Sequence, residues 1–299
     1  MDDESMRDAT REAVKAKFGR KRYLKAKVKP RYPAGVERDY IRTVDGLMSL
    51  LNKVVKEHMP EIEKAARREA EPLARFDDVQ DFAQAIQAAF EEMHQDLLDE
   101  IEMYGLRARL KKLAARGQAM SVREWKRTLK KTLGVDVTED YFRGGYFAEM
   151  IERWVDENVG LIKTIPSDTL AEMQNIIRRG YRNGVHSEEL IEEITSTYNV
   201  SKRHARFIAR DQTAKLNADI SEQQQRDAGV EKYEWSTSGD SRVRESHEKL
   251  DGKTFSWDDP PVVDEKTGRR CHPGQDYQCR CVALAVFDIE TLSLPIASA

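Results

Sequence analysis

The spacing of apolar residues divides this chain into two unequal parts that meet near Gly229. Before that glycine, apolar side chains recur at helical spacing in one segment after another. After it, Trp235 and other aromatic residues stand among turn residues, and Cys281–Phe287 is a short apolar run, which is typical of short strands with long connections. The sequence therefore predicts an α+β protein: an extended, mainly helical N-terminal region followed by a small α+β C-terminal domain with short strands.

The N-terminal part is expected to contain several helices separated by residues that end or cap them. Val36 to about His58 forms the first, and Pro60 ends or kinks it. The further expected helices run from Glu61 to about Phe76, Val79 to Ala115, Ser121 to Leu133, Thr138 to Gly160, Ser167 to Arg179, Glu188 to Tyr198 and Ser201 to about Arg226. Ser121, with Glu124 three residues later, has the spacing of a capping box, in which the two side chains satisfy free amides at a helix start.

Two breaks in the pattern give the expected domain boundaries. The stretch from Lys29 to Gly35 contains two prolines and a glycine and cannot continue a helix. A second boundary is expected near Gly160 to Pro166. The predicted organisation is a basic N-terminal arm (1–35), a helical region (36–160), a C-terminal domain (161–290) and a tail (291–299).

The composition excludes a membrane-spanning protein. Apolar residues make up 39% of the 299 residues and charged residues 34%, which places the chain among charge-rich soluble proteins. No apolar run approaches the roughly 18–20 residues that a bilayer requires. The acidic start lacks the basic and then apolar order of a signal peptide. We therefore expect a cytoplasmic protein with no membrane contact.

The formal net charge of −3 hides a strongly basic segment near the N-terminus. Between Arg11 and Arg31, ten basic residues are opposed only by Glu12. Such a segment can bind phosphates, because neutralising them releases condensed counterions; the alternative interpretation is a solvated, partly disordered arm. The candidate contacts with nucleic acid or an acidic partner are Lys15, Lys17, Arg20, Lys21, Arg22, Lys25 and Lys27.

The three cysteines, Cys271, Cys279 and Cys281, are too few for a paired disulfide framework, so metal ligation or plain burial is expected. Zinc favours four nitrogen or sulfur ligands, and a structural zinc ion commonly stabilises a small, loop-rich domain. His247, Cys279 and Cys281, completed by either Cys271 or His272, would supply four ligands. One structural zinc ion is the cofactor that this pattern predicts.

The segment from Trp235 to Phe287 resembles the C-terminal domain of the Mu F-like minor head proteins of tailed bacteriophages. The resemblance is carried by Ser-Gly-Asp at 238–240, Leu-Asp-Gly at 250–252, and Pro-Gly-x-Asp before Cys-Arg-Cys. Upstream, Ile-Ala-Arg at 208–210 followed by Thr213 and Asn217 matches the same family, whereas Cys271 departs from its pattern. The motif residues expected to order the domain are Arg210, Asn217, Trp235, Asp240, Arg244, Asp251, Gly252 and Asp276.

This resemblance covers about Ile165 to Phe287 and implies a structural, non-enzymatic protein of the phage head. Proteins similar to this one are minor head components, associated with the portal vertex and needed for assembling heads that package and deliver DNA. The implied location is the virion, with assembly in the host cytoplasm. The implied partners are the portal protein, major capsid or scaffold proteins and packaged double-stranded DNA. The N-terminal helices would provide the surface that docks on the portal or the inner capsid.

Two alternative functions remain open at the level of sequence. A nucleic-acid hydrolase or toxin-like enzyme could be centred on His247, with Asp240 or Glu245 as a second proton-transfer group. Its phosphate clamp would be drawn from the nearby arginines, namely Arg242, Arg244 and Arg280. The other alternative is a non-specific DNA-binding module that depends on the basic segment.

Overall fold

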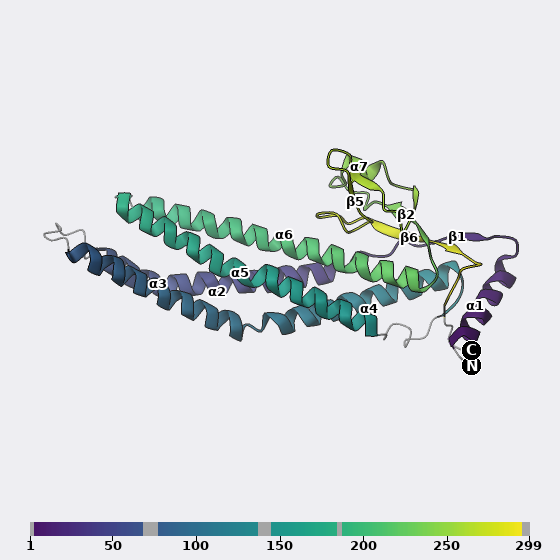
Figure 1. Ribbon diagram of the computed structural model, residues 1–299, viewed down its shortest axis with the longest axis horizontal. Helices are drawn as coiled ribbons and strands as arrows, with labels where there is room; N and C mark the ends of the chain where they lie inside the picture. The colour runs from purple at the N-terminus through teal and green to yellow at the C-terminus, as the bar shows by residue number, and fades with distance from the viewer. Residues whose placement is uncertain (1–2, 68–76, 137–144, 184–186, 295–299) are drawn as a thin grey trace. The chain divides into compact units, whose positions relative to one another are not determined.

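The computed structural model describes residues 3–67, 77–136, 145–183 and 187–294, and it confirms the predicted α+β class. The helices are α1 (Asp3–Phe18), α2 (Ala34–Arg67), α3 (Asp77–Met103), α4 (Leu106–Thr132), α5 (Gly145–Asn183), α6 (Ser187–Asp227) and α7 (Glu245–Glu248). The strands are β1 (Tyr23–Lys25), β2 (Lys232–Ser236), β3 (Thr254–Ser256), β4 (Val262–Asp264), β5 (Arg269–Arg270) and β6 (Val282–Asp288) (Figure 1). Parts of the expected helices over 61–76 and 138–160, and most of the tail, lie outside the described residues.

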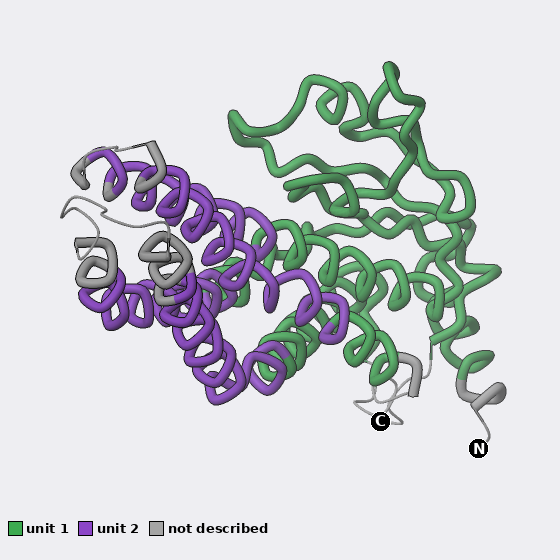
Figure 2. Tube along the Cα trace, turned by 60° about the vertical axis from the view of Figure 1, so that its left-hand side comes forward, with its two compact units in different colours: residues 1–38, 111–154, 210–299 green, residues 39–110, 155–209 purple. Residues whose placement is uncertain are grey.

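The chain forms two compact units that are interleaved in sequence (Figure 2). Unit 1 comprises Met1–Arg38, Lys111–Trp154 and Arg210–Ala299, and unit 2 comprises Asp39–Leu110 and Val155–Ala209. This division differs from the expected segments 36–160 and 161–290, because the long helices α2, α4, α5 and α6 each contribute residues to both units.

The expected start of a new helix at Ser167 is wrong, since α5 runs through Pro166 without a break. Proline removes one helical hydrogen bond and crowds the preceding turn. Here the residues on both sides of it, Ile162, Ile165 and Leu170, are buried in unit 2, and their packing holds the helix together. The hydroxyl of Thr169 also donates a hydrogen bond of 2.6 Å to the carbonyl oxygen of Ile165. Tertiary packing therefore outweighs the local cost of the proline.

Other expected helix boundaries are corrected in the same way. The helical pattern predicted from Val79 to Ala115 is divided at Gly105 into α3 and α4, because the φ of this glycine, 64°, lies in the left-handed region that ends helices. Ser121 is not a cap: it lies inside α4, and its buried hydroxyl donates to Oε1 of Gln224. Ser201 likewise lies inside α6, and the expected end of α2 at Pro60 is not observed.

Unit 2 is built from helices whose apolar stripes face a common core. Tyr40 and Asn158 are both buried, and the Tyr40 hydroxyl donates a hydrogen bond of 2.6 Å to Oδ1 of Asn158. Gly46 lets the ring of Tyr104 approach, because a Cβ at this position would lie 2.4 Å from the Tyr104 hydroxyl oxygen. That hydroxyl donates to the carbonyl oxygen of Thr43 at 2.8 Å. No helix in the described part of the chain has the length and apolar character needed for crossing a bilayer.

Unit 1 contains an antiparallel sheet with the strand order β1-β6-β2-β3. The central strand β6 pairs with β2 on one side, with Tyr233 opposite Ala285, and with β1 on the other, with Leu24 opposite Phe287. The C-terminal part of α6 lies along this sheet, and Gln225 donates a hydrogen bond of 3.0 Å to the carbonyl oxygen of Ala283. The strands predicted after Gly229 are thus confirmed, whereas β1 arises from a segment in which none was expected.

The N-terminal segment is not a solvated arm. Val14 of α1 is buried in a core with Trp125 of α4 and Phe287 of β6, whose rings stack with centroids 5.8 Å apart. Burying these apolar side chains stabilises the segment by about 1.5–3 kcal/mol for each. The interpretation as an arm was wrong because the apolar positions of α1 and β1 contact residues more than 100 positions away in sequence, a pairing that local spacing does not reveal.

Candidate metal centre

A buried cluster of one histidine and two cysteines lies between α7 and the start of β6. His247 belongs to α7, a single helical turn, and its side chain is 2% exposed. The turn after α7 is tied to β2, because Gly252 donates its N–H to the Trp235 carbonyl oxygen at 2.8 Å. The side chain of Asp251 accepts a hydrogen bond of 2.7 Å from the Thr237 N–H. The Leu-Asp-Gly motif therefore fixes the position from which His247 enters the core.

The two cysteines approach the same histidine nitrogen. Cys279 and Cys281 are separated by one residue just before β6, a spacing that places both side chains on one side of an extended chain. Their sulfur atoms lie 3.5 Å and 3.7 Å from Nδ1 of His247. The residue between them, Arg280, reaches Oδ2 of Asp240 at 2.5 Å instead. The loop therefore presents two sulfur atoms and one nitrogen to a common point.

These distances fit the coordination geometry of zinc. A tetrahedral zinc ion lies about 2.3 Å from sulfur and about 2.0–2.1 Å from nitrogen, which separates two such ligand atoms by about 3.5 Å. All three ligand atoms lie within 4.8 Å of one another, and all three residues are buried. The cluster thus has the donor set and the spacing of three zinc ligands.

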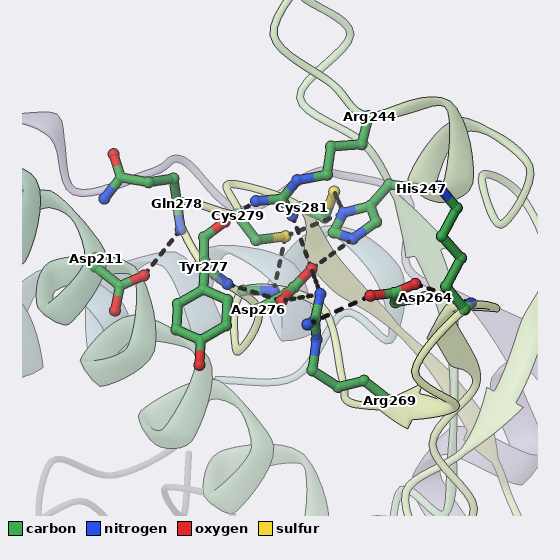
Figure 3. A network of polar contacts seen from close by, with 12 residues as sticks. Asp211, Arg244, His247, Asp264, Arg269, Asp276, Tyr277, Gln278, Cys279 and Cys281 are labelled. Carbon is green, nitrogen blue, oxygen red and sulfur yellow. Dashed lines mark hydrogen bonds and ion pairs between the residues drawn. The ribbon is translucent and has the colours of Figure 1, made fainter.

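Asp276 holds the imidazole in the tautomer that a metal needs (Figure 3). Its Oδ2 atom lies 3.1 Å from Nε2 of His247, and the carboxylate is 1% exposed. An ionised carboxylate can only accept, so Nε2 carries the proton and Nδ1 keeps its lone pair for the sulfur side. Arg244 at 2.7 Å and Arg269 at 3.1 Å compensate the buried charge of Asp276.

The surroundings of the sulfur atoms favour a thiolate at Cys279. A hydrogen bond from Cys281 lowers the pKa of the Cys279 thiol to about 5, against the opposing effect of burial. The same hydrogen bond, together with burial, raises the pKa of Cys281. The Gly274 N–H donates to the Cys279 sulfur at 3.4 Å. The buried indole N–H of Trp235 has no hydrogen-bond partner among the described residues.

The two candidates for a fourth ligand, His272 and Cys271, lie in different surroundings. Nδ1 of His272 is 2.8 Å from the Tyr233 hydroxyl, and its ring packs 4.9 Å from that of Trp257, so His272 belongs to a neighbouring aromatic cluster. Burial lowers the pKa of His272. Cys271 is half-buried, and burial raises the pKa of its thiol to about 12. Within the described chain, neither residue joins the group formed by His247 and the two cysteines.

A cavity of about 230 Å³ borders this cluster. All three ligand residues line it, and so do four arginines, which are Arg210, Arg242, Arg244 and Arg280. Arg210 lies 3.7 Å from Glu37, while Arg242 and Arg280 share Asp240. Arg244 shares Asp276 with Arg269, which also lies 3.6 Å from Asp264. These five guanidinium groups are thus balanced by four carboxylates, which leaves positive charge in excess beside the cluster.

Several residues of this region were not singled out in the sequence. Asp211, on α6, accepts a hydrogen bond of 2.8 Å from the N–H of Gln278, a non-glycine residue with a φ of 53°. Arg269 and Glu37 also act through contacts between segments that are distant in sequence. Asn217 lines a separate small cavity beside Gln224, so it does not join Arg210 at the metal side.

The basic residues of the N-terminal segment are divided between internal ion pairs and exposed positions. Lys15 pairs with Glu290 at 2.9 Å, Arg22 pairs with Asp288 at 2.9 Å, and Lys25 pairs with Glu234. Arg22 and Lys25 remain exposed despite these pairs, and so are the candidate contacts Lys17, Arg20, Lys21 and Lys27. The side chain of Lys17 passes over Gly134, close to the end of α4. Sequence analysis missed that α4 is itself basic, although it contains ten lysine and arginine residues and one acidic residue, Glu124.

Fold and site together define a helical protein with a small β-domain built around a buried His-Cys-Cys cluster. Residues 171–284, which include most of α6 and the whole cluster, match the family described as Phage Mu protein F like protein. The resemblance expected from the sequence is confirmed over these residues.

An uncharacterized protein of Haemophilus influenzae (strain ATCC 51907 / DSM 11121 / KW20 / Rd) is 34% identical to this chain over 174 residues. The similarity covers 58% of this chain and 38% of that protein, so the chain spans well under half of the relative's length. No solved structure matches the chain.

Proposed function

We propose that this chain is a structural component of a tailed-phage head, acting in head assembly at the portal vertex. The observation that carries the proposal is the match of residues 171–284 to the Phage Mu protein F like family. The matched segment includes the motif residues that anchor the small domain, among them Asp251, Gly252 and Asp276. A domain held together in this way presents a fixed scaffold for assembly.

The geometry at His247 favours a structural role over the hydrolase alternative. A general base must have a nitrogen within reach of the substrate proton. Nε2 of His247 is hydrogen-bonded to Asp276, Nδ1 faces the sulfur atoms of Cys279 and Cys281, and the side chain is buried. Both ring nitrogens are therefore engaged inside the protein, and neither is available for proton transfer with a nucleic acid.

We place the contact with the portal or inner capsid in unit 2. Leu161 of α5 and Val200 of α6 are 44% and 53% exposed, and both line an open cavity of about 520 Å³. The cavity is also lined by polar residues, Asp168 and Glu172 among them, so a partner helix with an apolar face and a polar edge would fit it. The protein would then enter the virion through this contact during assembly in the host cytoplasm.

A deletion and complementation experiment tests the head role. Removing the gene from the phage that encodes it should give empty or non-infectious particles, and the wild-type chain should restore titre and be found in purified heads. Val200→Lys should reduce incorporation into heads without unfolding the protein. Asn199→Lys is the matched control, because it adds the same charge at the neighbouring exposed position. Normal infectious titres without the gene would contradict the proposal.

We also propose that packaged double-stranded DNA contacts the exposed cations of unit 1. Lys17, Arg20 and Lys21 are exposed, and Lys17 brings this group close to the basic end of α4, where Lys131 is also exposed. Contacts of this kind depend on phosphate neutralisation and not on base sequence. Other polyanions should therefore compete with DNA for these cations.

Fluorescence anisotropy with random-sequence DNA at several salt concentrations tests this contact. The triple variant K17A/R20A/K21A should bind more weakly, and its plot of log K against log salt should be less steep by about 0.9 for each phosphate that is no longer neutralised. The control variant K56A/K163A/R203A removes three exposed cations of unit 2 and should bind as wild type does. Equal losses of affinity in both variants would show that only net charge matters.

A further inference from the structure

We propose that His247, Cys279 and Cys281 bind one Zn²⁺ through Nδ1 and two thiolates, and that its fourth coordination position is open to a small anion or water from the arginine-lined cavity. This inference does not depend on the phage-head role. The zinc site expected from the sequence has four protein ligands. The site proposed here has three, and neither Cys271 nor His272 is among them.

Separate observations support the binding of zinc by these three residues. The distances from Nδ1 of His247 to the two sulfur atoms, 3.5 Å and 3.7 Å, match the separation of about 3.5 Å expected between tetrahedral ligands. The hydrogen bond from His247 to Asp276 is the second-shell contact that metal-bound histidines almost always make. The N–H group of Gly274 is directed at the sulfur atom of Cys279, which becomes anionic when it binds a metal.

The lining of the cavity indicates where the fourth position lies. His247, Cys279 and Cys281 all border the cavity, whereas Cys271 and His272 do not. A zinc ion with two thiolates and a neutral imidazole carries no net charge, so the arginines next to it would determine which ligand enters. Their excess of positive charge favours an anionic oxygen, such as that of a phosphate or a carboxylate.

The ion would join two loops that have little regular structure of their own. His247 lies in the loop between β2 and β3, and both cysteines lie in the loop that leads into β6. Metal ligation stabilises such a region directly, because the site does not exist in the unfolded chain and the binding free energy adds to the folding free energy. An open fourth position adds the capacity to hold an anionic group of a partner on this face of unit 1.

Metal content tests the ligand set. Purified full-length protein should contain one zinc per chain, and the variants Cys279→Ser and Cys281→Ser should contain much less. Cys271→Ser is the matched control, since it makes the same change at a neighbouring thiol and should keep one zinc. If Cys271→Ser loses zinc as the other two do, Cys271 is the fourth ligand and the open position is overturned. Well under one zinc per chain in the wild-type protein would overturn the site itself.

Cobalt substitution tests the fourth position without depending on variants that could unfold. Co²⁺ bound by two thiolates and a histidine has absorption bands in the visible region that respond to the remaining ligand. Adding inorganic phosphate or acetate to the Co²⁺-loaded wild-type protein should shift these bands in a saturable manner. The arginine variant Arg280→Gln should weaken this shift without loss of cobalt. A spectrum unchanged by either anion would show that anions do not reach the metal, and it would overturn the anion position proposed here.

Discussion

Nε2 of His247 and Oδ2 of Asp276 lie 3.1 Å apart, and both side chains are almost completely buried. The pair joins two motifs separated by 29 positions in the chain, the turn of α7 and the Pro-Gly-x-Asp loop. Arg244 pairs with the same carboxylate oxygen, and Arg269 pairs with the other one, Oδ1. Asp276 therefore determines the direction in which the free lone pair of His247 points, which makes it a positioning residue for the cluster.

The first prediction concerns this positioning. Asp276→Asn should lower the affinity for zinc by about 10- to 100-fold, the usual effect of losing the carboxylate behind a metal-bound histidine. The amide fills the same space but has no charge to compensate Arg244 and Arg269. A competition titration with a zinc chelator measures the effect. Asp264→Asn is the control, because Asp264 pairs with Arg269 at 3.6 Å and is not a partner of His247. Equal affinities in all three proteins would contradict the positioning role.

The second prediction separates His272 from the metal. Tyr233→Phe removes the hydroxyl that lies 2.8 Å from Nδ1 of His272, and a buried nitrogen without a partner costs about 1–3 kcal/mol. The free energy of unfolding should fall by that amount in a denaturant titration, while the zinc content stays at the wild-type value. Tyr277→Phe, at a residue that is 55% exposed, should change neither quantity. Loss of zinc from Tyr233→Phe would place His272 at the metal.

Residue types alone indicated which side chains could form a metal cluster, but not which of them lie together. His247, Cys279 and Cys281 could be named as candidate ligands because few other side chains bind zinc. The choice against His272 depends on Tyr233, on a strand 39 positions away, and no local pattern reveals that contact. The same limit applies to β1, whose pairing of Leu24 with Phe287 is a contact between distant parts of the chain.

The helix boundaries depend on both local and tertiary signals. The break at Gly105 has a local cause, a glycine at a φ of 64°, and the sequence contained that signal. The continuation of α5 through Pro166 has a tertiary cause, since Ile162 and Leu170 are buried on either side of it. Spacing therefore predicted the class of fold, whereas packing determined where individual helices begin and end.

The third prediction tests the turn that follows α6. Gly229 has a φ of 75°, and a Cβ there would lie 2.0 Å from the carbonyl oxygen of Thr291. The Thr291 hydroxyl also donates to the Gly229 carbonyl oxygen at 2.9 Å, so the two segments cannot separate without breaking this bond. Gly229→Ala should therefore destabilise unit 1 by more than the roughly 1–2 kcal/mol that the left-handed conformation costs alone.

Gly239 provides the control for that prediction. Its φ of 74° is nearly the same as that of Gly229, but a Cβ there meets no described atom within 4 Å. Gly239→Ala should therefore show only the conformational cost of about 1–2 kcal/mol in thermal or denaturant unfolding. Equal destabilisation in the two variants would mean that the proximity of Thr291 adds nothing.

The fourth prediction is a pH dependence at the junction of β1 and β6. Burial alone would raise the pKa of Asp288, but hydrogen bonds from Arg22 and from the Glu290 N–H lower it. A carboxyl group with a lower pKa in the folded state adds stability above its unfolded pKa of about 3.9, and this contribution disappears as the pH falls. Arg22→Ala should therefore reduce the free energy of unfolding only slightly at pH 7, because solvent screens an ion pair whose arginine is exposed.

The sign of the effect can be checked by repeating the denaturant titrations at low pH. The difference between wild type and Arg22→Ala should shrink as the pH falls below about 4, because Asp288 becomes protonated and the wild-type protein loses the ion pair that the variant already lacks. Arg20→Ala removes a neighbouring exposed cation and should match wild type at every pH. A difference that persists unchanged at pH 3 would show that Arg22 stabilises β1 by packing over Tyr23, its other contact, and not through the charge of Asp288.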